Sequence, residues 1–399
     1  MRRMGWLGLR TVPVRAVLRQ SSSRAVAEYL AVSTGAAVVT SVVDSVSEYR
    51  FPHPLVSTQL HLLLSLAILI IVCLAARILE RIGGGRRALT GTAAHPHSSS
   101  PTRTLASLAS LLPPPPIAST LWAHLTPYTL TAALCSTLAA LLDIRAHRTL
   151  DPSFWSFARL LPILITAFIS LVSPSRLLPS SLTSAGKAMP GILVAATLLG
   201  GEGVSAEGGR GAWPCAIGWA LAVTGWVAAV QTGMEQAEEG EADTRRAADD
   251  SSEGTSSTAP PTIFLHLLLS VLLLAFPTAL SGEVASIRRY RHYGFFAEIG
   301  FWAQEVVTSL CGLANLAAFW HLISTCDTLT TFLVASIKDY LLPRIFHSLL
   351  DNPLDALSLG EATLSTRQQL FIFALVAALV FMSRMGAEEE KGSRGRRRE

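Results

Sequence analysis

The apolar residues of this chain fall into about ten blocks, which polar, Pro-rich or Gly-rich segments separate. Each block approaches the roughly 20 residues that an α-helix needs to cross a lipid bilayer. The pattern therefore predicts an all-α, polytopic membrane protein with about ten transmembrane helices. The expected helices cover residues 27–48, 55–79, 121–142, 154–173, 186–203, 213–233, 262–282, 298–320, 323–348 and 367–385.

About ten helices divide into two units of five, and units with an odd number of crossings take opposite orientations in the membrane. We therefore expect two inverted five-helix repeats, a common design among transporters. The first and fifth blocks contain Gly, Ser or charged residues. If one of these two blocks does not span the membrane, the two termini lie on opposite faces.

Composition shifts divide the chain further. Two loops, 83–118 and 234–261, are rich in Gly, Ser and Pro or in acidic residues, a composition typical of disorder. The expected organisation is a basic tail at 1–26, a first transmembrane unit with six helices at 27–233, an acidic loop at 234–261, a second transmembrane unit with four helices at 262–386 and a basic tail at 387–399.

Half of the residues are hydrophobic and only 15% are charged, which excludes a soluble domain with a charged surface. With ten helices, most of the 32 Lys and Arg fall on the face that holds both termini, and the positive-inside tendency makes that face cytosolic. The basic residues flank membrane segments and do not interleave with aromatic residues. We therefore expect no nucleic-acid partner.

Two basic segments leave alternatives open. The N-terminal segment contains six Arg and no acid before Glu28, as organelle transit peptides and uncleaved cytosolic flanks both do, and we favour the uncleaved flank. The segment Arg288-Arg289-Tyr290-Arg291 falls on the face opposite to the termini. It either lines the mouth of an anion path or forms a flexible basic loop.

The chain lacks the motifs of an enzyme or a metalloprotein. HExxH and GxSxG do not occur, and the five Cys are scattered without CxxC spacing. His95-Pro-His97 offers only two metal ligands. We therefore expect no catalytic residues, no metal and no cofactor.

Two cations lie inside apolar blocks at matching places in the two halves. Arg159 in the fourth block and Lys338 in the ninth are each followed by Leu-Leu-Pro, ending at Pro162 and Pro343. A charge at the bilayer centre costs at least about 2.5 kcal/mol, so it persists mainly where it faces a wet cavity or an anion. Inverted repeats would make the fourth and ninth helices equivalent, and both cations would then approach one central cavity.

The Pro residues would interrupt the helices behind the two cations, which transporters tolerate where the backbone faces a cavity. The alternative is that each cation extends from near a helix end to the membrane interface.

Other ionisable residues of the blocks complete the candidate binding site: Asp44, Asp339 and Arg344. Asp339 points about 100° away from Lys338 around a helix, so it need not neutralise that cation. Four lone His lie in apolar blocks or at their ends, where backbone or interhelical hydrogen bonds usually satisfy them. They are His61, His266, His321 and His347.

Several segments carry a family resemblance. Phe51-Pro-His-Pro-Leu-Val-Ser-Thr-Gln59 resembles the Phe-Pro-Tyr-Pro-like start of the second helix in triose-phosphate and nucleotide-sugar transporters of the drug/metabolite transporter superfamily. Thr328-Leu-Thr330, followed at a distance by Lys338, is similar to the Pro-Leu-Thr segment that precedes the family's Lys-Arg pair. Further resemblances are Phe154 with Arg159 in the fourth helix, Met189-Pro-Gly191 in the fifth and 368–385 in the last.

The chain also departs from the family pattern. Asp44-Ser45 stands where many members have Asn-Lys, and Asp339 stands where the sugar-phosphate branch has Arg. In that branch the cations bind substrate phosphate, so the resemblance implies such a role for Lys338 and Arg159. It implies a divergent antiporter that exchanges an anionic nucleotide sugar or phosphorylated sugar for a counter-anion across an endomembrane.

The departures and the long loops suggest one alternative, a transporter-like membrane scaffold without transport. The expected location is the Golgi or endoplasmic reticulum membrane with both termini cytosolic, and an organelle envelope is the other possibility. The expected partners are the solute, the counter-anion and membrane lipid, with a homodimer left open.

Overall fold

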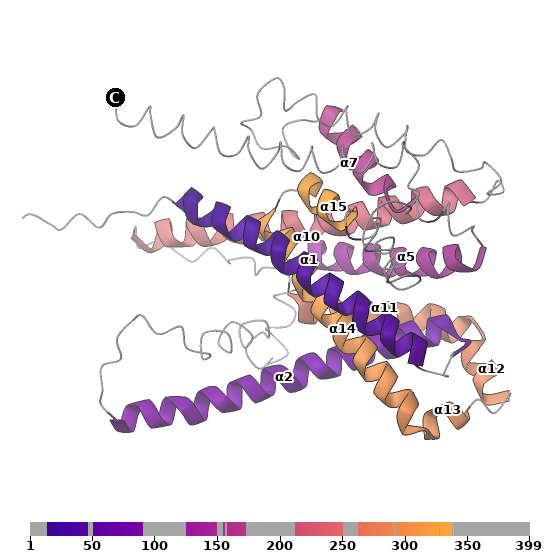
Figure 1. Ribbon diagram of the computed structural model, residues 1–399. Helices are drawn as coiled ribbons and strands as arrows, with labels where there is room; N and C mark the ends of the chain where they lie inside the picture. Colours follow the sequence, from indigo (N-terminus) through magenta and orange to yellow (C-terminus); the bar gives the residue numbers. More distant parts are fainter. Residues whose placement is uncertain are drawn as a thin grey trace, which may run out of the picture.

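The computed structural model describes residues 14–46, 51–90, 125–149, 155, 158–172, 212–249, 262–289, 293–326, 328–336 and 338. All regular structure in these residues is helical, without any strand (Figure 1). The helices are α1 (Val14–Val46), α2 (Pro54–Thr90), α5 (Pro127–Thr149), α7 (Leu161–Val172), α10 (Ala212–Asp249), α11 (Ile263–Leu280), α12 (Glu283–Arg289), α13 (Tyr293–Ala297), α14 (Ile299–Thr325) and α15 (Thr328–Ser336).

Six of these helices are long and apolar enough to cross a membrane. Their membrane segments are Arg24–Val43, Pro54–Ala75, Pro127–Arg148, Trp213–Ala237, Ile263–Leu280 and Ile299–Thr325. Large apolar side chains on their outer surfaces are exposed, such as Phe276 at 71% and Leu272 at 61%. Lipid chains can cover such surfaces at no hydrophobic cost. The prediction of an all-helical protein with several membrane-spanning helices is thus confirmed for the described residues.

The helix ends gather at two ends of the bundle. At the first end, α2 and α10 begin where α5 ends, since Cys215 of α10 lies 3.6 Å from the carbonyl of Leu142. At the second end, α5 begins beside the later part of α10, where Gln236 donates a 2.7 Å hydrogen bond to Tyr128. The N-terminal part of α1 lies there beside the end of α14, with Glu28 and His321 3.7 Å apart. The six spans therefore alternate in direction as the sequence predicts.

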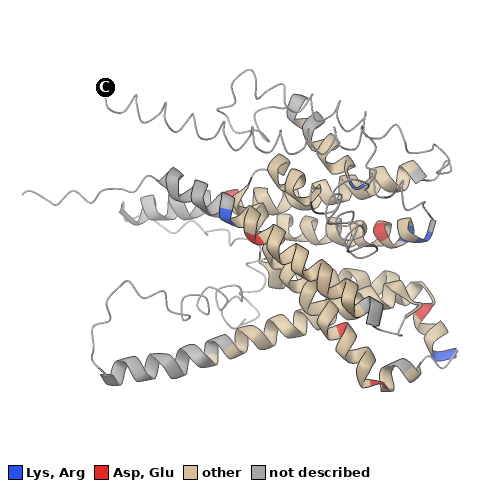
Figure 2. Ribbon diagram, viewed as in Figure 1, with Lys and Arg blue, Asp and Glu red and all other residues tan. Residues whose placement is uncertain are grey.

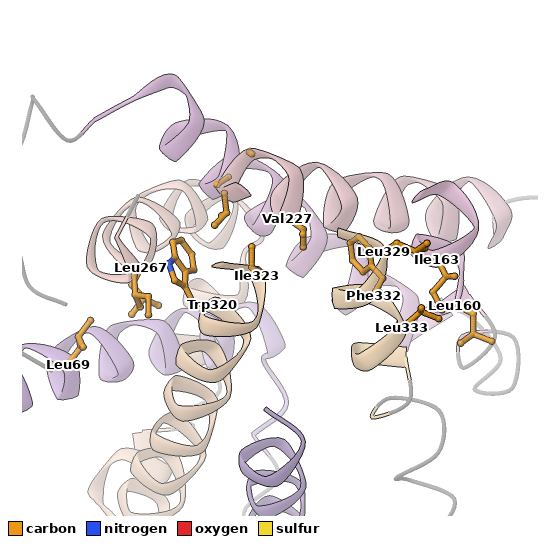
Figure 3. Close-up of a cluster of buried hydrophobic side chains, with 14 of the residues drawn as sticks. Leu69, Leu160, Ile163, Val227, Leu267, Trp320, Ile323, Leu329, Phe332 and Leu333 are labelled. Atoms are coloured by element: carbon orange, nitrogen blue, oxygen red, sulfur yellow. The ribbon is translucent and has the colours of Figure 1, made fainter. Parts of the chain in front are cut away.

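The core lies where α2, α5, α7, α10, α11, α14 and α15 meet. Figure 3 shows its largest cluster, in which Trp320 and Ile323 of α14 lie between Leu267 of α11 and Val227 of α10. Leu160 and Ile163 pack near Leu333 of α15 in the same cluster. The short helices α7 and α15 are thus fixed by apolar contacts to the long ones.

Small residues allow α5 and α10 to pack closely. A Cβ atom added to Gly225 of α10 would lie 3.1 Å from the sulfur of Cys135, and one added to Gly218 would lie 3.3 Å from Leu142. Ala132, Ala139 and Ala146 on α5 are all buried. Small side chains are the usual means by which membrane helices approach each other.

Two helices extend into loops that the sequence predicted to be disordered. α10 continues to Asp249, within the predicted acidic loop 234–261, and α2 continues to Thr90, within 83–118. The added part of α10 is rich in Ala, Glu, Gln and Arg, which are good helix formers, and extending an existing helix avoids the nucleation cost. These parts of the two loops are therefore helical in the structure, where the sequence predicts disorder. α1 likewise begins at Val14, within the predicted tail 1–26.

Candidate functional site: polar side chains within the helix bundle

Charged residues lie mostly toward the helix ends, with long uncharged stretches between them (Figure 2). Glu305 on α14 is an exception, because it is inside a membrane segment and only 4% exposed. A buried carboxylate in such a place is expensive and is kept mainly for function or with a partner. The candidate site is therefore built around Glu305 and the polar side chains of the neighbouring helices.

Glu305 contacts a histidine of a neighbouring helix. Nε2 of His61 on α2 lies 2.6 Å from Oε2 of Glu305. The direction of approach does not suit a hydrogen bond, so this oxygen has no hydrogen-bond donor among the described residues. The side chain of His61 is 32% exposed and that of Glu305 is 6% exposed. The histidine is therefore the outer member of the pair.

The polar contacts continue along α2. One turn beyond His61, the buried Ser65 donates a 3.1 Å hydrogen bond to the carbonyl of Ser309 on α14. On the other side of His61, Gln59 donates a 3.0 Å hydrogen bond to the carbonyl of Val271 on α11. The other side-chain atom of Gln59, Oε1, is buried without a hydrogen-bond partner among the described residues. α2 thus presents polar groups to both of its main neighbours.

A second polar group lies among aromatic rings. His266 of α11 is 4% exposed and stacks on Trp226 of α10, with ring centroids 5.4 Å apart and planes inclined by 8°. Trp320 of α14 packs against the same imidazole at 5.3 Å. Neither Nδ1 of His266 nor Nε1 of Trp226 has a hydrogen-bond partner in the described part of the chain. These two nitrogens are buried groups that a polar ligand would satisfy.

The helix is interrupted between α14 and α15, and the side chain of Gln231 of α10 forms hydrogen bonds with groups on both sides of this interruption. Its amide nitrogen donates to the carbonyls of Ile323 at 3.3 Å and Cys326 at 2.9 Å. Its amide oxygen accepts a hydrogen bond from the hydroxyl of Thr328. A helix end inside a membrane protein needs such partners, because its last carbonyls have none within the helix. The Thr328-Leu-Thr330 segment therefore begins α15 beside α10.

Lys338 follows α15 and lies beside α1. Its Nζ is 5.9 Å from the centre of the Tyr29 ring, a cation–π distance. Tyr29 itself is buried against Leu322 and Val334. The ammonium group is thus near α1 and α15, within the bundle.

Arg159 lies at the first end of the bundle, in a turn that precedes α7. Its Nη2 is 3.6 Å from Oδ1 of Asp143 near the end of α5, and its guanidinium is 5.9 Å from the Trp155 ring. Arg159 and Leu160 form a turn between the helical residues Trp155 and Ala158 and the start of α7, and the N–H group of Arg159 donates to the carbonyl of Trp155 at 3.2 Å. Pro162 lies in the first turn of α7, where a missing N–H group is tolerated.

The structure describes the side chains of two of the five predicted site residues, Arg159 and Lys338. Arg159 contacts α5 and Trp155, and Lys338 contacts α1, so these contacts do not join the two cations. Asp44 belongs to α1, but its side chain lies outside the described residues, as do Asp339 and Arg344. A shared cavity for the five residues stays a prediction.

The Phe-Pro segment before α2 is held by residues that the sequence analysis missed. Phe51 packs against Phe296 and Phe301 at 5.7 Å each. Glu283 of α12 accepts hydrogen bonds from the backbone N–H groups of Leu55 at 3.0 Å and Val56 at 3.1 Å. This carboxylate caps the start of α2. The Phe-Pro segment therefore has a structural role at the first end of the bundle.

The other missed residues are Glu305 and Gln231. Glu305 had a usable signal, because it is an acid within the apolar block 298–320 and intramembrane acids are candidates for function. Gln231 had none, since an uncharged amide near the end of a block is unremarkable. No three His, Cys, Asp or Glu of the described residues come together as a metal site.

Comparisons with known proteins add no family. No family model and no curated protein matches this chain. The chain is similar to a solved structure described as "Crystal structure of protein", at 15% identity and a TM-score of 0.48; the match covers 93% of this chain and 99% of the other. At this level of similarity we transfer neither a fold nor a function from it.

Proposed function

We propose that this protein is a secondary transporter that exchanges an anionic nucleotide sugar or phosphorylated sugar for a counter-anion, as a divergent relative of the triose-phosphate and nucleotide-sugar transporters. The observation that carries the proposal is the set of polar groups buried within membrane-spanning helices, above all the His61–Glu305 contact and the unsatisfied nitrogens of His266 and Trp226. Apolar side chains would pack there at lower cost. Such groups are typical of a solute path.

Lys338 and Arg159 are the proposed phosphate ligands in this scheme. Charge-assisted hydrogen bonds from a cation to a phosphate are among the strongest in proteins. Arg159 is held only loosely, because its contact with Asp143 is 3.6 Å long and both side chains are about a third exposed. Such a contact contributes at most about 1 kcal/mol, so a phosphate can replace Asp143. Asp44, Asp339 and Arg344 complete the proposed site.

The aromatic cluster of α10, α11 and α14 suits a nucleotide. Trp226, His266 and Trp320 are flat apolar rings with polar edges, and in this conformation they pack on one another. Nucleobases stack on such rings with about 1–3 kcal/mol per base. This feature favours the nucleotide-sugar branch of the proposal over sugar phosphates alone.

Transport would follow from rocking of two inverted five-helix units around the solute. The end of α5 and the start of α10 meet at the same end of the bundle. The proposed fourth and fifth helices, which cross the membrane once each, are compatible with this arrangement. We infer a location in the Golgi or endoplasmic reticulum membrane from the family resemblance and the uncleaved start, and cytosolic termini from the charge distribution.

The test is transport in proteoliposomes. The purified protein is reconstituted, loaded with an unlabelled anion and supplied with labelled UDP-, GDP- and CMP-sugars and with sugar phosphates. We expect uptake of one solute that internal anion stimulates, and its loss by at least about tenfold in Lys338→Gln, because one charge-assisted contact contributes about 1.5–3 kcal/mol. Lys391→Gln in the C-terminal tail is the matched control. Normal exchange by a well-folded Lys338→Gln would refute the role of Lys338.

A transport-free scaffold is the second candidate. The extension of α10 from the membrane segment to Asp249 favours it, because this helix carries many acidic residues outside the bilayer and could bind a partner protein. Solute exchange by the wild type would exclude this candidate. A stoichiometric partner that depends on residues 238–249, without any solute exchange, would establish it.

A further inference from the structure

We propose that His61 and Glu305 form an intramembrane proton-binding site that couples solute transport to a pH gradient. This inference rests on the proposed transport function and names its driving ion. It is carried by the 2.6 Å contact between the two side chains and by the burial of Glu305.

The two residues lie at the same depth in the membrane. His61 is in the second turn after the start of α2, and Glu305 is in the second turn after the start of α14. At a rise of 1.5 Å per residue, each lies about 10 Å along its helix, inside the membrane segment. α2 and α14 both begin at the first end, because Glu283 binds the start of α2 and Phe51 packs on the α14 residue Phe301. The pair is therefore near the first end but below its surface.

One proton shared by the pair makes the contact attractive. With one proton, the two groups 2.6 Å apart are imidazolium with carboxylate or imidazole with carboxylic acid. A second proton converts the pair to imidazolium with carboxylic acid, which removes the ionic attraction of this contact. Loss of this attraction is the step that links proton binding to movement of the two helices.

Neighbouring charged groups already have other partners. On the elements packed against α2, Glu283 of α12 is bound to Arg148 of α5, and His266 of α11 is stacked on Trp226 and packed against the tilted ring of Trp320. On α1, which packs against α14, Glu28 is paired with Arg24. Glu298 at the start of α14 and Glu235 on α10 are exposed and near helix ends. Among the described residues of this region, the His61–Glu305 pair combines a buried carboxylate with a partly exposed imidazole that can pass a proton to it.

A purely structural role explains the contact less well. One turn further, α2 and α14 are joined by a serine hydroxyl and a backbone carbonyl, Ser65 and Ser309, which need no charge. A buried ion pair rarely stabilises more than apolar residues of the same size. The partly exposed imidazole also provides a path by which a proton reaches the buried carboxylate.

The test compares two transport modes in the same proteoliposomes, with the labelled solute that the wild type exchanges. Equilibrium exchange is measured at equal pH on both sides, and net accumulation is measured with a difference of one pH unit. One proton per solute gives up to about tenfold accumulation per pH unit in the wild type. We expect Glu305→Gln to lose accumulation but keep exchange, Glu305→Asp to restore part of it, and Glu298→Gln, an exposed carboxylate of the same helix, to behave as wild type.

Accumulation by a folded Glu305→Gln equal to that of the wild type would overturn the proposal. So would a wild type whose exchange proceeds while a pH gradient drives no accumulation. If the wild type exchanges no solute at all, the proposed function fails, and infrared spectroscopy then decides on the proton site alone. A carboxyl C=O band whose intensity changes with pH in the wild type, is absent in Glu305→Gln and shifts in His61→Gln supports the site; the lack of such a band refutes it.

Discussion

Replacement of Glu283 by Ala should weaken the first end of the bundle, because this carboxylate caps α2. One carboxylate oxygen accepts hydrogen bonds from the N–H groups of Leu55 at 3.0 Å and Val56 at 3.1 Å. The other oxygen accepts a hydrogen bond from Nη2 of Arg148 at 3.0 Å. Removal of an N-cap costs about 0.5–2 kcal/mol, and a hydrogen bond to a charged group contributes about 1.5–3 kcal/mol. Glu283 is only 8% exposed, so water replaces these bonds poorly. We expect Glu283→Ala to lower the free energy of unfolding by about 2–4 kcal/mol.

Two further variants separate the capping bonds from the ion pair. Glu283→Gln keeps an oxygen that accepts the backbone N–H groups and should cost about 1 kcal/mol, the difference between a charged and a neutral acceptor. The side chain of Arg148 is 54% exposed, so Arg148→Gln should cost about 0–1 kcal/mol. Unfolding of the purified protein in mild detergent, followed by tryptophan fluorescence, gives the order of the three variants. If Arg148→Gln destabilises the protein as much as Glu283→Ala, the ion pair dominates and the capping argument is wrong.

Two more predictions concern packing and topology. Gly225→Val should destabilise the contact of α5 with α10 by about 1–3 kcal/mol, because the added Cβ would lie 3.1 Å from the sulfur of Cys135. A Cβ added to Gly35 on α1 meets nothing within 4 Å, so Gly35→Ala should be neutral or slightly stabilising. Thermal unfolding compares the two variants, and equal stability would disprove close packing at Gly225. Single cysteines at Ala285 of α12 and at Glu235 of α10, both exposed, should react with a membrane-impermeant maleimide from opposite sides in a background without the native cysteines. Labelling of both from one side would contradict the two-ended arrangement.

Long apolar runs made the spanning helices predictable. The predicted segment 262–282 became α11, Ile263–Leu280, and 298–320 became α14, Ile299–Thr325. In both, the hydrophobic length required by the bilayer determines the helix with little help from tertiary contacts. The extension of α10 to Asp249 was missed because a high density of acids was taken as disorder, although Ala, Glu and Gln also favour helix. Hydropathy limits the membrane segment of a helix and says nothing about how far the helix continues in water.

The placement of Arg159 was missed for a different reason. Aromatic and apolar residues on both sides of it gave one continuous block, 154–173, and hydropathy cannot separate a turn from a helix within such a block. A signal was nevertheless present in Pro162, because Pro in the first helical turn is common and Pro in a helix interior is not. That preference would have placed the helix start near Leu161, where α7 begins. That start favours the alternative in which Arg159 lies near a helix end and extends to the membrane interface.

The His61–Glu305 contact shows which part of a site a single sequence can supply. Once α2 and α14 are assigned the same direction, their distances from the helix start give both side chains the same depth, about 10 Å. The pairs His61–Glu305 and Ser65–Ser309 are each separated by 244 positions, as parallel helices in a fixed register require. The rotation of each helix and the identity of its neighbour come from packing instead, since lipid and protein interior are equally apolar and hydropathy cannot distinguish them. Depth was therefore predictable from the sequence, but the pairing needed the three-dimensional arrangement.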